Sequence, residues 1–189
     1  MRMTKAEKRV EIAKDVLKQI KAKKYKPECG VWFQDSNGVG LNEFIDWSKS
    51  KVLDAKKDIV DKLEGTCSVC ALGSLFVSAI DKYNHTKLDT SLFCADNEVF
   101  TSIDGNNPLN KWFTTRQLLL IENTFEYGLG AWSPDAVLNK NELDYWYETV
   151  EFAIGKYNYK YPSSTNRLKA IMNNIIRNKG TFVLPGVKL

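Results

Sequence analysis

The sequence predicts a single, mainly α-helical domain of about six helices with a small β element. The first observation is the segment 66–80, which carries no charge, is rich in small residues and has almost no polar stripe. Such a segment is typical of a central buried helix, which we expect at 67–83. The second is apolar residues at helical spacing behind capping residues elsewhere in the chain. The third is size: 189 residues, 43% of them hydrophobic, suffice for one packed core.

The N-terminal half is expected to begin with an amphipathic helix at 4–24. Thr4 and Glu7 form a capping box, in which a hydroxyl and a carboxylate satisfy exposed backbone N–H groups. Pro27 is expected to end this helix, because proline cannot continue it. The elements expected next are a short strand at 31–33, a turn at 35–40, a strand or helix at 41–47, and a helix at 50–64 that ends at Gly65.

The C-terminal half is expected to open with the irregular stretch 84–113, read as loop with one or two short strands. The small β element is therefore expected near 31–47 or 88–103. The expected helical elements are a helix from Thr114 or Thr115 to about Tyr127, a helix start at Ser133, an aromatic helix at 142–157, and a last helix at 165–178 that is capped by Ser164 or Thr165 and followed by a left-handed Gly180.

Charge is segregated along the chain. Residues 1–26 hold ten Lys/Arg and three Asp/Glu, and residues 159–189 hold six Lys/Arg and no Asp/Glu. The segment between them holds eleven Lys/Arg and twenty Asp/Glu. If the two ends pack side by side, they form a basic face suited to nucleic acid. We favour the alternative, in which the basic ends largely cancel the acidic middle. The residues expected to contact phosphates in the first case are Lys14, Lys18, Lys21, Arg167 and Lys169.

The aromatic helix carries the candidate for protein binding. Tyr145, Trp146 and Tyr147 are consecutive, and consecutive helical residues point in different directions. At least one of the three rings should therefore lie near the surface. Exposed aromatic residues are common at protein interfaces, although packing against 84–113 explains the cluster equally well.

The cysteines are expected to be buried structural thiols. Cys67 and Cys70 have a metal-like spacing, but Cys29 and Cys94 stand alone and His85 is the only histidine. We therefore expect neither a metal site nor a cofactor, while a site of four distant cysteines stays open. A redox role for the pair needs a strand before the helix, and a helix is expected there instead.

The enzyme hypothesis is a cysteine nucleophile at a helix start, best represented by Cys67 with His85 as its base. The other three cysteines are weaker candidates for the same role. A lone histidine in a polar loop is usually solvated, so we lean against catalysis.

Targeting signals are not expected. No apolar run reaches the roughly 18 residues that a membrane span needs. The N-terminal residues open a charged helix rather than an apolar signal segment, so secretion is not expected. Four cysteines without a dense spacing indicate free thiols in a reducing compartment. The oligomeric state is open.

Four sequence blocks resemble a group of uncharacterised proteins of tailed bacteriophages and prophages. The blocks lie at 12–17, 67–76, 117–126 and 167–182, and the most specific are the Cys-x-Val-Cys-Ala-Leu-Gly-x-Leu-Phe segment and the C-terminal Arg-Leu-x-x-Ile-Met-x-Asn-Ile-Ile segment. The resemblance implies a virus-encoded protein acting in the cytoplasm of a bacterial host. Small phage proteins of this kind often bind and blunt a host factor, including defence proteins, so the leading expectation is a non-enzymatic inhibitor of that type.

Overall fold

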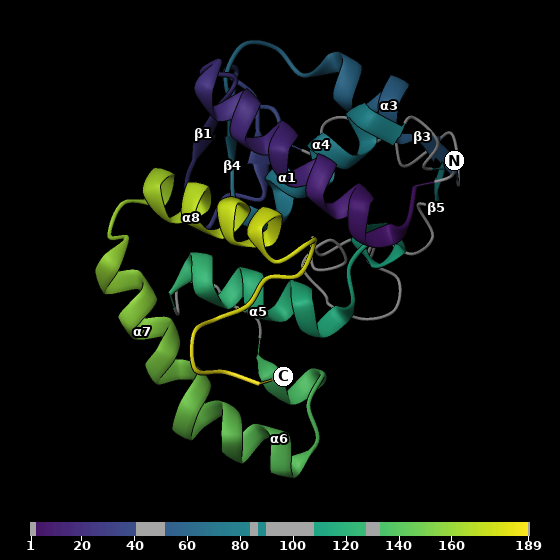
Figure 1. The fold of residues 1–189 in the computed structure, drawn as a ribbon. Helices are drawn as coiled ribbons and strands as arrows, with labels where there is room; N and C mark the ends of the chain where they lie inside the picture. The colour runs from purple at the N-terminus through teal and green to yellow at the C-terminus, as the bar shows by residue number, and fades with distance from the viewer. Residues whose placement is uncertain (1–2, 41–51, 84–86, 90–107, 128–132, 189) are drawn as a thin grey trace.

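The computed structural model describes residues 3–40, 52–83, 87–89, 108–127 and 133–188. Helices dominate these residues, and the strands form one sheet of three strands and one of two (Figure 1). The predicted fold class, mainly α with a small β element, is confirmed. Its organisation as one domain stays a prediction. None of the helices described here is both long and apolar enough to cross a bilayer.

Helix α1 (Lys5–Lys21) begins as the sequence predicts. The Glu7 N–H donates to the Thr4 hydroxyl at 3.2 Å, and the Thr4 N–H donates to the Glu7 carboxylate at 2.7 Å, which confirms the capping box. The helix ends three residues earlier than predicted, because Lys23 adopts a left-handed φ of 59°. Pro27 does not end the helix but lies in the following strand, at an edge of the sheet where its missing N–H is tolerated.

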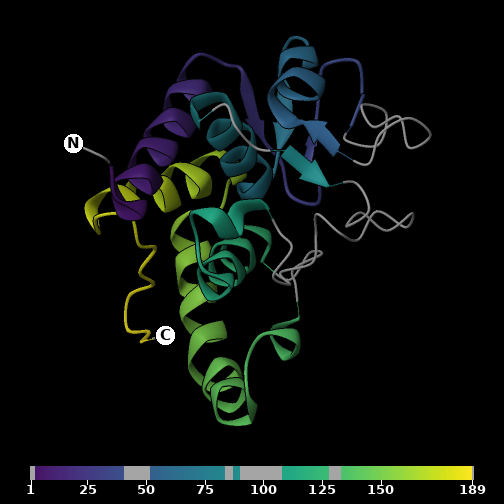
Figure 2. The same cartoon turned by 90° about the vertical axis from the view of Figure 1, so that its right-hand side faces the viewer.

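Helix α8 (Ser164–Arg177) lies beside α1, as both views show (Figure 1, Figure 2). It begins one residue earlier than predicted, with Ser163 as its cap. Gly180 has the expected left-handed φ of +94°, and a Cβ there would lie 2.4 Å from the Ala6 carbonyl oxygen. Because Gly180 follows α8 and Ala6 opens α1, the two helices run antiparallel. The two basic ends of the chain are thus brought side by side.

The predicted buried helix at 67–83 is corrected at its start. Residues Cys67–Val69 form strand β4, and helix α4 (Ala71–Tyr83) follows. Strand β4 pairs in parallel with β1 (Tyr25–Pro27) and antiparallel with β2 (Phe33–Gln34), in the order β1-β4-β2. The partners come from a distant part of the chain, so no local signal marks this strand.

Helix α4 is central, as predicted. Every residue from Ala71 to Ile80 is buried. Gly73 allows the close approach expected of it, because a Cβ there would lie 1.6 Å from the Trp32 carbonyl oxygen. The Cys70 N–H donates to the same carbonyl at 3.2 Å and ties the start of α4 to the sheet.

The predicted helix at 50–64 is wrong in its extent. The described part begins with strand β3 (Val52–Asp54) and continues with short helices α3 (Ala55–Asp58) and η1 (Val60–Lys62). Strand β3 pairs antiparallel with β5 (Lys87–Asp89), so tertiary pairing replaces the first helical turn. The expectations for 41–47, for most of 84–113, and for His85 and Cys94 lie outside the described residues.

The C-terminal half is a helical layer below α8 (Figure 1). Helix α5 (Thr115–Glu126) starts at its predicted cap, Thr114. The predicted aromatic helix is a rod of three parts that follow without a break: α6 (Lys140–Tyr145), the π-helix η5 (Trp146–Val150) and α7 (Glu151–Lys160). Two short 3-10 helices complete the described chain, η3 (Pro108–Lys111) and η4 (Pro134–Ala136), the latter at the predicted start Ser133.

Candidate functional site

The three consecutive aromatic residues occupy three different environments. Tyr147 is 49% exposed, which confirms that at least one ring lies near the surface. Tyr145 is half-buried, and its hydroxyl accepts a hydrogen bond from the Lys188 N–H at 3.1 Å. Trp146 is only 1% exposed and belongs to the core. Of the three expected partner-binding residues, the structure therefore leaves Tyr147 on the surface and removes Trp146 from it.

The π-helix η5 places Tyr147 on this surface. The Glu151 N–H donates to the Trp146 carbonyl, a bond across five residues instead of the four of an α-helix. The extra residue changes the angular register between α6 and α7, so side chains on either side of it take directions that a regular helix would not give them. Such wide turns are rare and often lie at functional sites.

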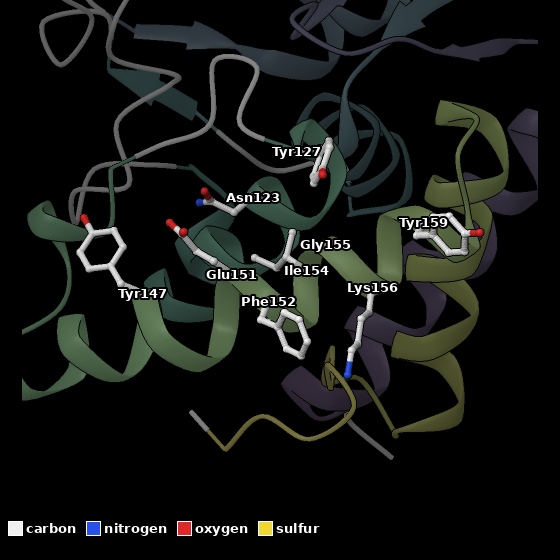
Figure 3. Close-up of a pocket in the computed structure, with 9 residues that line it drawn as sticks. All are labelled: Asn123, Tyr127, Tyr147, Glu151, Phe152, Ile154, Gly155, Lys156 and Tyr159. Atoms are coloured by element: carbon white, nitrogen blue, oxygen red, sulfur yellow. The ribbon is translucent and has the colours of Figure 1, made fainter.

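Tyr147 lies at one end of a groove of about 950 Å³ along the rod (Figure 3). Beyond it, Glu151, Gly155 and Tyr159 follow one another at four-residue steps in α7 and thus share a face of that helix. Gly155 forms an open floor, because a Cβ there would meet nothing within 4 Å. Tyr127, at the end of α5, stands over the middle of this row in Figure 3.

Four large aromatic side chains around the groove are exposed: Tyr127, Tyr147, Phe152 and Tyr159. We call this set the aromatic groove. Tyr159, at 91% exposed, contributes almost nothing to the core. The Lys156 ammonium lies 4.2 Å from the centre of the Phe152 ring. A cluster of exposed aromatic rings is typical of an interaction surface.

Tyr127 is held in a conformation that a bulky residue rarely adopts. It ends α5 with a left-handed φ of 51°, and its N–H donates to the Asn123 carbonyl at 3.1 Å. Glycine is the usual residue at such a position. A strained and exposed tyrosine does little for stability, which favours a role for its ring in the groove.

Charge differs between the two ends of the aromatic groove. Near Tyr147 the segment 133–155 holds five acidic residues and one basic residue. Glu142 pairs with Arg116, and Asp135 and Glu151 act electrostatically on the Tyr147 hydroxyl. Near Tyr159 the exposed charges are those of Lys156 and Lys160. An occupant with a basic group toward the Tyr147 end would match this distribution of charge.

The expected phosphate-binding residues divide into two groups. Lys14, Lys18 and Lys21 of α1 are exposed, as is Lys169 of α8. Arg167 is different: it is buried, and its guanidinium donates to the carbonyls of Phe125, Tyr161 and Pro162. Arg167 therefore holds the loop before α8, and its burial argues against a phosphate contact.

Cys67 does not stand at a helix start, as the enzyme hypothesis assumed, but begins strand β4. It lines a hollow of about 440 Å³ together with Tyr25, Lys56 and Asp81. Burial, reinforced by Asp35, raises the pKa of the Cys67 thiol to about 11, which disfavours the thiolate that catalysis needs. Two charged groups of the hollow, Lys56 and Asp81, already form an ion pair.

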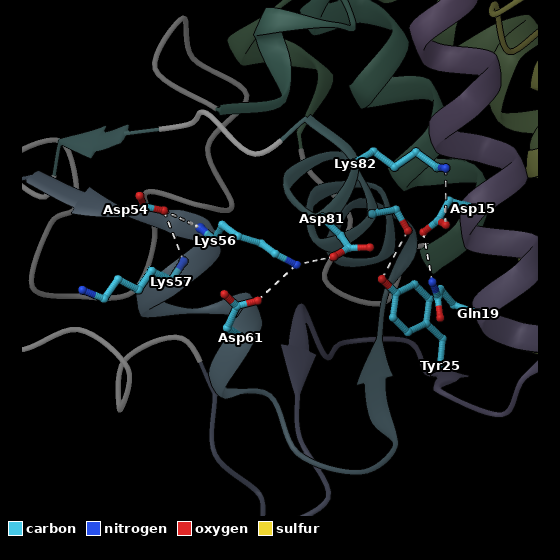
Figure 4. A network of polar contacts seen from close by, with 10 residues as sticks. Asp15, Gln19, Tyr25, Asp54, Lys56, Lys57, Asp61, Asp81 and Lys82 are labelled. Atoms are coloured by element: carbon cyan, nitrogen blue, oxygen red, sulfur yellow. Dashed lines mark hydrogen bonds and ion pairs between the residues drawn. The ribbon is translucent and has the colours of Figure 1, made fainter.

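The pairing in this region is a network between helices. The Lys56 ammonium binds the carboxylates of Asp61 and Asp81, and Figure 4 shows it between them. On the other side of α4, Lys82 lies 3.8 Å from the buried Asp15. These contacts join α1, α3, η1 and α4, so we assign them a structural role.

A second polar cluster lies deep in the protein, and sequence reasoning missed it. Cys70, Glu122 and Glu126 are buried, and their ligand atoms lie within 4.8 Å of one another. Burial and then Glu126 raise the pKa of Glu122 to about 8, and burial raises that of Glu126 to about 7. The available signal was spacing: both glutamates interrupt the apolar face of α5 at consecutive turns.

Comparison with known protein families, curated proteins and solved structures finds no match for this chain. The geometry and charge of the aromatic groove are what bear on its function.

Proposed function

We propose that this chain is a non-enzymatic binding protein whose aromatic groove takes up a segment of a bacterial host protein and thereby modulates it. The observation that carries the proposal is four exposed aromatic rings around the open floor at Gly155. The resemblance to phage proteins supports a bacterial host factor, such as a defence component, as the partner. It also supports the bacterial cytoplasm as the place of action.

The chemistry of the groove defines the expected occupant. An apolar or aromatic side chain fits over Gly155, where rings flank the floor and no side chain fills it. A Lys or Arg of the same segment fits near Tyr147, where the surrounding charge is acidic. The groove supplies aromatic faces and charges rather than a nucleophile beside a base, which favours binding over catalysis.

Affinity capture from bacterial cells tests the proposal with two substitutions at one position. Gly155→Leu fills the floor, whereas Gly155→Ala adds a single methyl group in open space. We expect wild type and Gly155→Ala to retain the same host protein in near-stoichiometric amount, and Gly155→Leu to retain at least tenfold less. Equal recovery by all three proteins would remove the groove from the proposal.

Nucleic-acid binding is the second candidate, because α1 and α8 do lie side by side. The proposed contacts are Lys14, Lys18, Lys21 and Lys169, without Arg167. Phosphate contacts release counterions, so the affinity would fall steeply as salt increases. Filter binding of DNA and RNA at low salt tests this, with Lys18→Glu expected to weaken retention. Absence of retention at micromolar protein would exclude it.

A further inference from the structure

Cys70, Glu122 and Glu126 meet between the start of α4 and the last two turns of α5. Cys70 directly precedes α4, and the two glutamates are four residues apart on the face of α5 that packs on it. The Cys70 sulfur and one carboxylate oxygen from each glutamate lie within 4.8 Å of one another. All three residues are more than nine-tenths buried. The cluster is separate from the aromatic groove and carries a different kind of chemistry.

Two of these three side chains, Cys70 and Glu126, are oriented by a backbone N–H. Gly73 donates to the Cys70 sulfur at 3.3 Å, and Gly30 donates to Glu126 Oε2 at 2.8 Å. The Leu72 backbone favours the charged form of Glu122 and so lowers its pKa, against the larger effect of burial. Outer hydrogen bonds of this type fix the direction of ligands in metal sites.

One oxygen of each glutamate is left without a hydrogen-bond partner. Among the described residues, no group donates a hydrogen bond to Glu122 Oε2 or to Glu126 Oε1, and both atoms are inaccessible to solvent. A buried acceptor without a partner is destabilising and rare in folded proteins. The cluster therefore combines a sulfur and carboxylate oxygens at short range with two buried acceptor atoms whose hydrogen-bonding capacity is unused.

Charge balance points to a divalent cation. A thiolate and two carboxylates carry three negative charges, and the Arg167 guanidinium, which acts electrostatically on Glu126, supplies one positive charge. A divalent cation would neutralise the remainder. Without an ion, protons must do so, which agrees with the raised pKa values of both glutamates and of the Cys70 thiol.

We propose that Cys70, Glu122 and Glu126 form a zinc site. Magnesium and calcium select oxygen ligands alone, whereas zinc accepts a mixed set of sulfur and carboxylate oxygen. Three protein ligands leave a fourth position on the ion for water or another donor. Binding releases the thiol proton and any proton held by the glutamates, so the affinity rises with pH.

Cobalt(II) is the reporter in the test, because a Co(II)–thiolate bond gives a charge-transfer band in the near ultraviolet. The full chain is stripped with a chelator and titrated with Co²⁺, then with Zn²⁺ as competitor. We expect one ion per chain, a charge-transfer band, and its displacement by one equivalent of Zn²⁺. Cys70→Ser should abolish the band, and Glu122→Gln should weaken Zn²⁺ binding at least tenfold.

Cys67→Ser is the matched control, since Cys67 is a buried cysteine three residues away that is not in the cluster. It should leave the band and the affinity unchanged. Circular dichroism establishes that each variant is folded, and Glu126→Gln provides a second ligand substitution if Glu122→Gln does not fold. The proposal is overturned if no ion binds at micromolar concentration, which leaves a proton-sharing carboxyl pair, or if binding is unaffected by Cys70→Ser and the glutamine variants. Neither result bears on the aromatic groove.

Discussion

Trp146 and Tyr147 are adjacent in the chain, but one is buried and the other is exposed. The Trp146 side chain is buried in the core, whereas Tyr147 reaches the aromatic groove. Both belong to the π-helix η5. One helical rod therefore contributes to the core with one face and to the candidate binding site with the next, and the two roles can be separated by substitution.

Trp146→Ala should destabilise the fold by about 3–5 kcal/mol, because it leaves a large cavity where a tryptophan ring was packed. Tyr147→Ala should change the free energy of unfolding by less than about 0.5 kcal/mol, as is usual for an exposed residue, while reducing capture of the partner. Urea unfolding measures both. Similar stability of the two variants would contradict the assignment of Trp146 to the core.

Two glycines should respond in opposite directions to alanine. Gly155→Ala should stabilise the protein by about 0.5–1 kcal/mol, because Gly155 lies within α7 and the added methyl meets nothing. Gly180→Ala should destabilise it by more than about 1 kcal/mol, because φ is +94° and the Ala6 carbonyl blocks the new Cβ. Thermal unfolding of the two variants side by side checks the prediction. A loss of stability in Gly155→Ala would mean that the groove floor is not open.

Stability without added metal should fall as pH rises between about 4.5 and 8. The pKa of Glu122 is raised to about 8 and that of Glu126 to about 7 in the folded state, so the folded protein holds protons that the unfolded chain has released. Stability from these groups is fully present below pH 4.5 and is lost as pH rises through the folded values, with a limit of about 1.4 kcal/mol per pH unit for each group. Urea unfolding at several pH values across this range should show that the free energy of unfolding changes less with pH in Glu122→Gln than in the wild type. An unchanged dependence on pH would contradict protonation of Glu122 in the folded protein.

The thiols of Cys67 and Cys70 should alkylate slowly in the folded protein. Burial raises the pKa of the Cys67 thiol to about 11 and raises that of Cys70 as well, so little thiolate forms near neutral pH. Iodoacetamide labelling followed by peptide mass spectrometry should show both cysteines modified only after denaturation. Labelling of Cys67 in the folded state as fast as free cysteine would revive the enzyme hypothesis.

Elements with local start signals could be predicted from the sequence. The caps Thr4 and Thr114 fix the starts of α1 and α5, because each cap bonds an N–H group within the next three residues. Strand β4 could not be predicted, because its partners β1 and β2 lie more than 30 residues earlier in the chain and only the fold brings them together. The π-helix η5 could not be predicted either, because nothing in its local sequence marks the extra residue.

For the candidate sites, too, some features follow from the local sequence and others depend on the fold. Exposure of one ring among Tyr145, Trp146 and Tyr147 follows from helical geometry, but which ring is exposed depends on how the rod packs. The expectation that Arg167 contacts phosphate is wrong, because its guanidinium donates to three backbone carbonyls. These carbonyls lie in the loop before α8 and at the end of α5, and only the fold brings them to Arg167. The cluster at Cys70 depends on α5 facing the start of α4, which spacing alone does not reveal.

Site-specific photo-crosslinking in bacterial cells tests most directly whether the aromatic groove, rather than the basic face, holds the partner. A photoreactive phenylalanine analogue replaces Phe152 in the groove in one protein and the exposed Lys18 of α1 in another. The host protein that is recovered by affinity capture should be crosslinked from position 152 and not from position 18. This crosslink should disappear when Gly155→Leu is added. A product from position 18 alone, or a product from position 152 that persists with Gly155→Leu, would contradict the groove as the binding site.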